Sequence, residues 1–259
     1  MLLTSIDALG GVFLDSCRYF GEIGIFTWGS ISTLFTSRPD FKKIFYQMHY
    51  IGVNSISIVF LVGSAIGAVL ALQSHEGLVR FGSTQFIGPI VFLSMTREFG
   101  PVFTAIMVIG RAGSAMTAEL GSMRISEQID ALETLCIDPH AYLIAPRIIA
   151  STIILPFLSM FCTFFGILAG YVAAVHVLGI NPDTYMEAIR ENVTMSDITS
   201  GLIKSTIFGF LFSVIATYKG YIARGGAKGL GIAITQSVVH SNVTIIITDY
   251  ILTSLMFTK

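Results

Sequence analysis

Long apolar runs separated by short polar sections dominate the pattern along the chain. Five of these runs are long enough, as helices, to cross a hydrocarbon core of roughly 30 Å. They cover about residues 51–73, 83–109, 144–178, 201–222 and 238–257. The pattern predicts an all-α, polytopic membrane protein with about five transmembrane helices, which form a single integral-membrane domain over residues 1–259. The composition agrees, because 12% of the residues are charged against about 25% in soluble domains.

The first 37 residues have a weaker pattern than the five runs. Apolar residues recur at helical spacing, but charged residues lie between them and several glycines interrupt the segment. This pattern is typical of a helix that lies in the membrane interface, with Trp28 at the level of the lipid headgroups. The alternative interpretation of residues 1–37 is a spanning helix of low hydrophobicity.

Glycine and proline positions predict local features of the runs. Gly63 and Gly67 form a GxxxG pair, which permits close helix packing in lipid, although the spacing also arises by chance. Pro89 and Pro101 are expected to bend the second helix, because proline lacks an amide hydrogen. Asn181, followed by proline, predicts the start of a short amphipathic helix.

The distribution of Lys and Arg predicts the orientation of the chain. With five spans and a cytoplasmic N-terminus, ten Lys and Arg residues are assigned to the inner side and four to the outer side. The four outer residues are Arg80, Arg190, Lys204 and Lys259. Residues 110–139 are therefore predicted to be cytoplasmic, and the segment 179–200 is predicted to be external.

The polar block at residues 110–139 is expected to form a hairpin of two short helices. Ser114 is the predicted cap of the first helix and Ser126 of the second. Both helices carry an apolar stripe that must be covered by lipid headgroups or by a protein. The second helix has an acidic polar face, whereas helices on membrane surfaces are usually rich in Lys and Arg. A cytoplasmic protein partner is therefore favoured.

Several segments resemble the MlaE (YrbE) permease family, the membrane subunits of lipid-trafficking ABC transporters. They are REFGP at 97–101, GRAGSAMTAELGSMRISEQIDAL at 110–132, DP at 138–139 and APR at 145–147. The resemblance covers essentially the whole chain. The first and last spans, however, match the family in their general character as apolar spans rather than in a sequence motif. It implies a homodimeric permease in the bacterial inner membrane that moves phospholipid or a related lipid to or from an external carrier.

The resemblance also implies partners and a coupling site. The implied partners are a cytoplasmic ABC ATPase subunit that hydrolyses ATP, an MCE-domain lipid-binding protein and a small accessory regulator. The charged block would be the coupling element that docks into a groove of the ATPase. The coupling contacts that we expect are Glu119, Leu120, Met123, Arg124, Glu127 and Gln128.

Arg97 and Glu98 lie near the centre of the second span, where a charge is costly and usually functional. One hypothesis is that they line or shape a lipid pocket. The other is a polar clasp that holds the helix to its neighbours, with Gln73 or Asp249 as partner. The family resemblance places the lipid cavity between two copies of the subunit. The further residues that we expect in its walls are Leu70, Gln73, Phe86 and Tyr250.

Other functional classes find little support in the sequence. The P-loop motif is absent, the five histidines are dispersed, and the three cysteines suggest neither disulfides nor a metal site. The glycine-rich ARGGAKGLG segment is expected to be a flexible turn. Enzymatic activity, cofactors and nucleic-acid binding are not expected. The alternative functions are a secondary transporter driven by an ion gradient, for which no internal repeat is found, and a membrane scaffold without transport.

Overall fold

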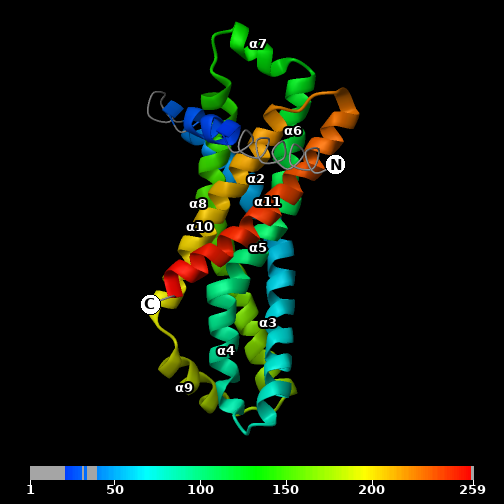
Figure 1. Ribbon diagram of the computed structural model, residues 1–259. Coiled ribbons are helices and arrows are strands. Elements are labelled where there is room, and N and C mark those ends of the chain that lie inside the picture. The colour runs from blue at the N-terminus through cyan, green and yellow to red at the C-terminus, as the bar shows by residue number, and fades with distance from the viewer. Residues whose placement is uncertain (1–20, 31, 34–39, 258–259) are drawn as a thin grey trace, which may run out of the picture.

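The computed structural model describes residues 21–30, 32–33 and 40–257, and within these ranges it contains helices and no strand (Figure 1). Five helical segments are long and apolar enough to cross a membrane. They are Phe41–Val79, Thr84–Ile125, His140–Val177, Met195–Tyr221 and Gly226–Met256. The expected all-α, polytopic membrane fold with five spans is therefore confirmed.

Most spans consist of several helical elements joined without a break. The first contains α2 (Phe41–Gly52), η1 (Val53–Ser55) and α3 (Ile56–Val79). The second contains η2 (Thr84–Phe86), α4 (Ile87–Ser94), η3 (Met95–Phe99), α5 (Gly100–Val108), η4 (Ile109–Gly113) and α6 (Ser114–Ile125). The third contains η5 (His140–Ile144), α8 (Ala145–Val172) and η6 (Ala173–Val177). The fourth and fifth are α10 (Met195–Tyr221) and α11 (Gly226–Phe257).

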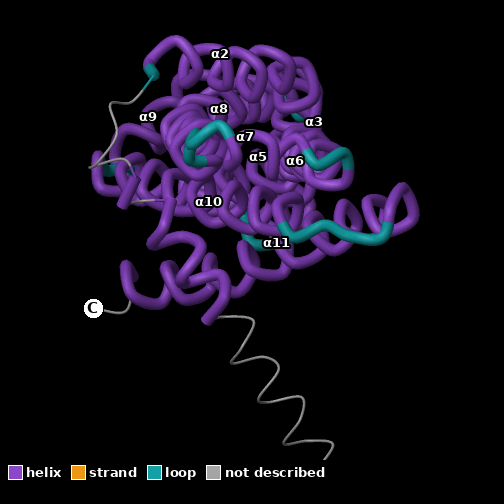
Figure 2. Tube along the Cα trace, turned by 90° about the horizontal axis from the view of Figure 1, so that it is seen from above, coloured by secondary structure: helices purple, strands orange, loops and turns teal. Residues whose placement is uncertain are grey.

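Two short helices mark the opposite ends of the bundle. The helix α7 (Gln128–Thr134) lies at one end, and α9 (Pro182–Asn192) lies near the other, close to the turn between α3 and α4 (Figure 1). Viewed from the α7 end, α2 lies along one side of the bundle and α11 along the opposite side (Figure 2). The predicted start of α9 is confirmed, because the side chain of Asn181 accepts a hydrogen bond from the amide of Asp183.

The third span is central to the packing, and its α8 contacts α3, α10, α2 and α5. Gly67 lies against Gly166 so closely that a Cβ atom added at Gly67 would overlap the carbonyl group of Gly166. A Cβ added at Gly63 would lie 2.7 Å from the carbonyl oxygen of Cys162. The GxxxG pair therefore has a specific role in packing α3 onto α8, as one of the two interpretations predicted.

Much of the predicted interfacial helix at 1–37 lies outside the described residues. Residues 21–30 and 32–33 are helical and lie beside the bundle near the α7 end (Figure 1). Phe26 packs against Tyr218 and Tyr221, with ring centroids 5.4 and 5.6 Å apart. Trp28 is 74% exposed. The placement of this helix at the lipid headgroups stays a prediction.

Two boundaries and one residue assignment from the sequence are wrong. The fourth span begins at Met195 rather than near residue 201, because Thr194 and Asp197 form a capping box there. Lys204, which was assigned to the outer side, lies well inside this span and is fully buried. The ARGGAKGLG segment is not a continuous flexible turn, since α11 already begins at Gly226.

Candidate functional site

The second span changes its helical geometry where its two charged residues lie. Pro101 has no amide hydrogen to donate to the carbonyl of Arg97. The preceding residues form the π-helical turn η3, in which the amide of Gly100 donates to the carbonyl of Met95. Such turns are frequent at functional sites. The sequence therefore places Arg97 and Glu98 on a locally widened turn between α4 and α5.

Arg97 joins this turn to the start of the fourth span. Its Nε donates to Oδ1 of Asp197 over 2.8 Å, and its Nη2 also contacts this oxygen. Asp197 is 2% exposed, and its other oxygen accepts the amide of Thr194 over 2.8 Å. One buried carboxylate thus caps α10 and holds the guanidinium of the second span.

Glu98 belongs to a separate cluster that joins three spans. The ammonium of Lys204 lies 2.6 Å from Oε2 of Glu98, 3.0 Å from Oδ1 of Asp249 and 2.7 Å from the hydroxyl of Thr253. The lysine side chain is fully buried, whereas those of Glu98 and Asp249 are 34% and 21% exposed. A buried ammonium is therefore balanced by two carboxylates that solvent or a ligand can still reach.

The structure brings some expected partners together and reveals others. Asp249 joins Glu98 through a shared lysine, whereas Gln73, the other predicted partner, is exposed on α3. Sequence reasoning missed Lys204 and Asp197 as members of the site. A charged residue within the apolar sequence GLIKSTIFGF was the available signal for Lys204.

The remaining predicted lipid-wall residues do not enclose a pocket within one chain. Leu70 is half-buried on α3, Phe86 is 42% exposed on η2, and Tyr250 is 77% exposed on α11. Phe86 precedes Glu98 by 12 residues on the same span, which corresponds to about 18 Å along a helix. These side chains are distributed along open surfaces, so a closed cavity would need additional walls.

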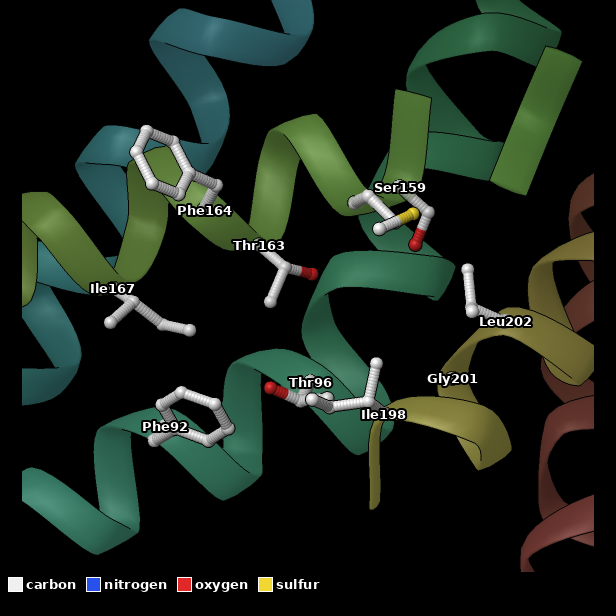
Figure 3. A pocket seen from close by; sticks show the side chains of 10 residues that line it. Phe92, Thr96, Ser159, Thr163, Phe164, Ile167, Ile198, Gly201 and Leu202 are labelled. Carbon is white, nitrogen blue, oxygen red and sulfur yellow. The ribbon is translucent and has the colours of Figure 1, made fainter. Parts of the chain in front are cut away.

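A separate apolar groove lies close to the same turn (Figure 3). It has a volume of about 210 Å³ and lies between α4, η3, α8 and α10. Phe92, Phe164 and Leu202 line it, together with Thr96, whose hydroxyl is buried without a hydrogen-bond partner. The groove is smaller than the 300–1,000 Å³ typical of ligand pockets, and none of the six predicted lipid-contact residues lines it.

The block at 110–139 differs from the expected pair of short helices. Its first half is the continuation of the second span through η4 into α6, so Ser114 caps no helix and donates to the carbonyls of Gly110 and Arg111. Ser126 is not the N-cap of the second helix either: it lies at the C-terminal end of α6, and its hydroxyl donates to the carbonyl of Ser122. The residue that precedes α7 is Glu127, with a left-handed φ of 58°.

The predicted coupling residues fall into exposed and buried groups. Glu127 and Gln128 are exposed at the turn, and Met123 is half-buried. Leu120 is fully buried beneath Gly220. The prediction that Leu120 is a surface anchor for a partner is therefore wrong, since this side chain packs the hairpin from within.

Two ion pairs hold the hairpin. Oε2 of Glu119 lies 2.8 Å from Nη2 of the buried Arg147 on α8. Arg124 on α6 contacts Asp130 on α7, with 2.6 Å between Nη1 and Oδ1. The hairpin is thereby fixed both to the third span and within itself.

Comparison with known proteins identifies the family. A family model described as "Permease MlaE" matches residues 44–255. The chain is 37% identical to the intermembrane phospholipid transport system permease protein MlaE of Haemophilus influenzae, over 99% of both chains.

Two further relatives extend the comparison. A probable ABC transporter permease protein of Rickettsia bellii is 38% identical over 99% of both chains. The chloroplastic protein TRIGALACTOSYLDIACYLGLYCEROL 1 of Arabidopsis thaliana is 38% identical over 83% of this chain and 62% of the plant protein. With five spans in one bundle and a match along most of its length, the chain belongs to the MlaE permease family.

Proposed function

We propose that the chain is the permease subunit of an ABC transporter that moves phospholipid or a related lipid between the bacterial inner membrane and an external carrier. The observation that carries this proposal is the match over 99% of both chains to a protein named as an intermembrane phospholipid transport permease. The charged turn in the second span supports it, because ionisable groups within membrane spans commonly mark substrate paths.

A cytoplasmic ABC ATPase is the proposed source of energy. The sequence has no P-loop, so ATP would be hydrolysed by a separate subunit. In this proposal the hairpin at 110–139 docks on the ATPase through Glu127, Gln128 and Met123, which lie at least partly exposed at its tip. Glu119 and Arg124 would hold the hairpin through their ion pairs with Arg147 and Asp130.

The proposed orientation places α7 in the cytoplasm and the segment 179–200 outside. Residues 1–259 form one integral-membrane permease domain in this account, with residues 1–37 at the interface. The structure supports opposite locations for the two polar segments, because α7 and α9 lie toward opposite ends of the bundle (Figure 1). The MCE-domain protein would then exchange lipid at the outer end. The accessory regulator is inferred from membership in the family alone.

A homodimer would provide the walls that one chain lacks. The helix α11 exposes a row of large side chains at helical spacing, namely Val239, Val243, Ile246 and Tyr250. Exposed apolar faces of this kind fit helix packing between subunits, although lipid also covers them. We propose that two copies enclose a lipid cavity whose walls include Arg97, Glu98, Leu70, Gln73, Phe86 and Tyr250.

The cluster around Lys204 suggests how a lipid headgroup is handled. The ammonium has two carboxylate partners, and both are partly exposed. A lipid phosphate that enters the cavity would attract the ammonium and compete with one carboxylate. The released carboxylate would then repel the phosphate, which favours its departure. We therefore propose that Glu98 controls how long the headgroup stays.

Co-purification in mild detergent tests the proposed function. We expect an ATPase subunit and phospholipid to accompany the wild-type chain. Glu127→Lys should reduce recovery of the ATPase at least tenfold, since like charges at an interface cost several kcal/mol. Glu76→Lys, an exposed residue on α3, is the matched control and should retain the ATPase. A chain that purifies without any ATPase and shows ion-dependent uptake would support the secondary transporter instead.

A further inference from the structure

A cationic cavity of about 390 Å³ lies between α2 and the start of the third span. Lys42, Lys43 and Arg147 line it, together with Gln47 and Tyr142. This volume lies within the range typical of ligand sites. The cavity is at the beginning of the first and third spans, separate from the charged cluster around Lys204.

Two residues that line this cavity each have a buried polar atom without a hydrogen-bond partner. Arg147 is 6% exposed and uses Nη1 for the carbonyl of Leu143 and Nη2 for Glu119, at 2.7 and 2.8 Å. Its Nε–H remains buried without an acceptor, and Oε1 of Gln47 is also unpaired. Unsatisfied buried groups are rare in proteins and require an explanation. A phosphate oxygen would accept the Nε–H, and the amide of Gln47 turned by 180° would donate to it.

The charge of the lining favours an anion. Asp40 is the one carboxylate among the described residues that line the cavity, and Glu119 pairs with Arg147 from outside the lining, so three cations are opposed by two carboxylates. Oδ1 of Asp40 accepts the amide of Lys42 at the start of α2, over 3.1 Å, and its Oδ2 lies 3.8 Å from the ammonium of Lys43. The ammonium of Lys43 lies 3.0 Å from the ring centroid of Tyr142, so the aromatic ring holds this cation at the rim. Water would satisfy the unpaired atoms but would leave the excess positive charge in place.

The surroundings of the cavity are those of a membrane interface. The face of α2 opposite Lys43 carries Phe41 and Phe45, each 67% exposed, as expected for two positions about 160° away on the helix. Phe45 lines a separate apolar hollow on that side, between α2 and α8. At the rim of the cationic cavity, Tyr46 and Tyr142 are exposed. Tyrosines are enriched where spans leave the hydrocarbon, and an amphipathic helix lies in the same zone.

We propose that this cavity binds the phosphate of an anionic phospholipid from the leaflet at the α7 end of the bundle. Basic pockets between membrane helices commonly bind anionic headgroups. Naming this leaflet the inner one rests on the proposed function and its orientation. The proposal that the cavity binds an anionic lipid does not rest on the proposed function. It follows from the cations, the unpaired buried atoms and the interfacial position of the cavity.

Lipid binding by the purified full-length chain tests the proposal without ATPase or transport. Detergent micelles would contain phosphatidylglycerol and phosphatidylcholine in equal amounts with identical acyl chains. Native mass spectrometry would then give the ratio of the two bound lipids. Lys43→Gln should lower the preference for phosphatidylglycerol about fivefold, the effect expected for one cation near an anionic headgroup. Lys228→Gln is the matched control, since it removes an exposed lysine from α11 and should not change the ratio.

Arg147 is left intact in this test, because its replacement would also release Glu119. An unchanged ratio in Lys43→Gln, or an equal loss in Lys228→Gln, would overturn the proposal. Displacement of phosphatidylglycerol by millimolar inorganic phosphate would assign the cavity to the free ion instead. Loss of ATPase binding in Lys43→Gln with an unchanged lipid ratio would identify an acidic protein partner and reject the lipid. Failure of the proposed function would appear separately, as absence of the ATPase from the wild-type complex.

Discussion

At the scale of single residues, Lys204 is the side chain on which the intramembrane cluster depends. It is fully buried and contacts Glu98 on the second span and both Asp249 and Thr253 on α11. The sequence identified Glu98 as a functional candidate because a charge in a span is costly. It did not identify the lysine, because the fourth span was expected to begin near residue 201, with Lys204 assigned to the external side. Side chains that meet across helices depend on tertiary packing, which one sequence does not display.

Replacing Glu98 by Gln should slow lipid transfer while the protein stays folded. The change keeps the shape of the side chain but removes the charge that competes for Lys204. The lysine keeps Asp249 and Thr253 as partners, so we expect a small change in thermal stability. Lipid transfer between reconstituted liposomes should fall about tenfold, which corresponds to roughly 1.4 kcal/mol.

The matched control for this change is Glu76→Gln, on an exposed position of α3, and it should transfer lipid at the wild-type rate. The clasp hypothesis gives a different outcome: Glu98→Gln has almost no effect, whereas in Glu98→Ala stability and transfer fall together. A folded Glu98→Gln complex with wild-type transfer would exclude Glu98 from the transport site.

At the scale of helices, the crossing of α3 and α8 is the contact most directly encoded in the sequence. The GxxxG spacing indicated a close approach, and the structure identifies the carbonyl of Gly166 as the group that Gly67 approaches. The sequence also predicted five spans from their length and apolarity. The structure differs most where the second span continues into the charged block.

The continuation of the second span has a physical reason. The π-helical turn η4 and α6 follow α5 without a break, and the hydroxyl of Ser114 satisfies carbonyls of the preceding turn. Serine has two uses near helices, as a cap and as a donor to a carbonyl of the preceding turn. The sequence alone does not decide between them. The continuous helix buries one face of α6, including Met116 and Leu120, and this packing favours it over a separate helix that starts at Ser114.

Gly67→Ala should destabilise the protein, because the added Cβ would overlap backbone atoms of α8 that cannot rotate away. Overpacking of this kind costs typically about 1–3 kcal/mol, so we expect a lower midpoint of thermal unfolding in detergent. Gly77→Ala lies on the same helix, where an added Cβ meets nothing within 4 Å. This control should unfold at or above the wild-type midpoint. Equal midpoints for the two variants would contradict the close crossing.

At the scale of the whole molecule, the account depends on the two ends of the bundle facing different compartments. Single cysteines at Asp130 and Asp183 would report this orientation. The background needs Cys17→Ser and Cys136→Ser, because the exposed native Cys136 lies near α7 and would react itself. In intact spheroplasts an impermeant thiol reagent should label position 183 and not position 130. Equal labelling of both positions would contradict the arrangement of five spans.

The central claim is that this chain forms the lipid path of a transporter driven by ATP. Its most direct test is the transfer of fluorescent phospholipid out of proteoliposomes that contain the chain with its co-purified ATPase and an external lipid acceptor. The account predicts transfer that requires ATP hydrolysis and is insensitive to collapse of ion gradients. Transfer that continues without ATP and stops when an ion gradient is collapsed would contradict it.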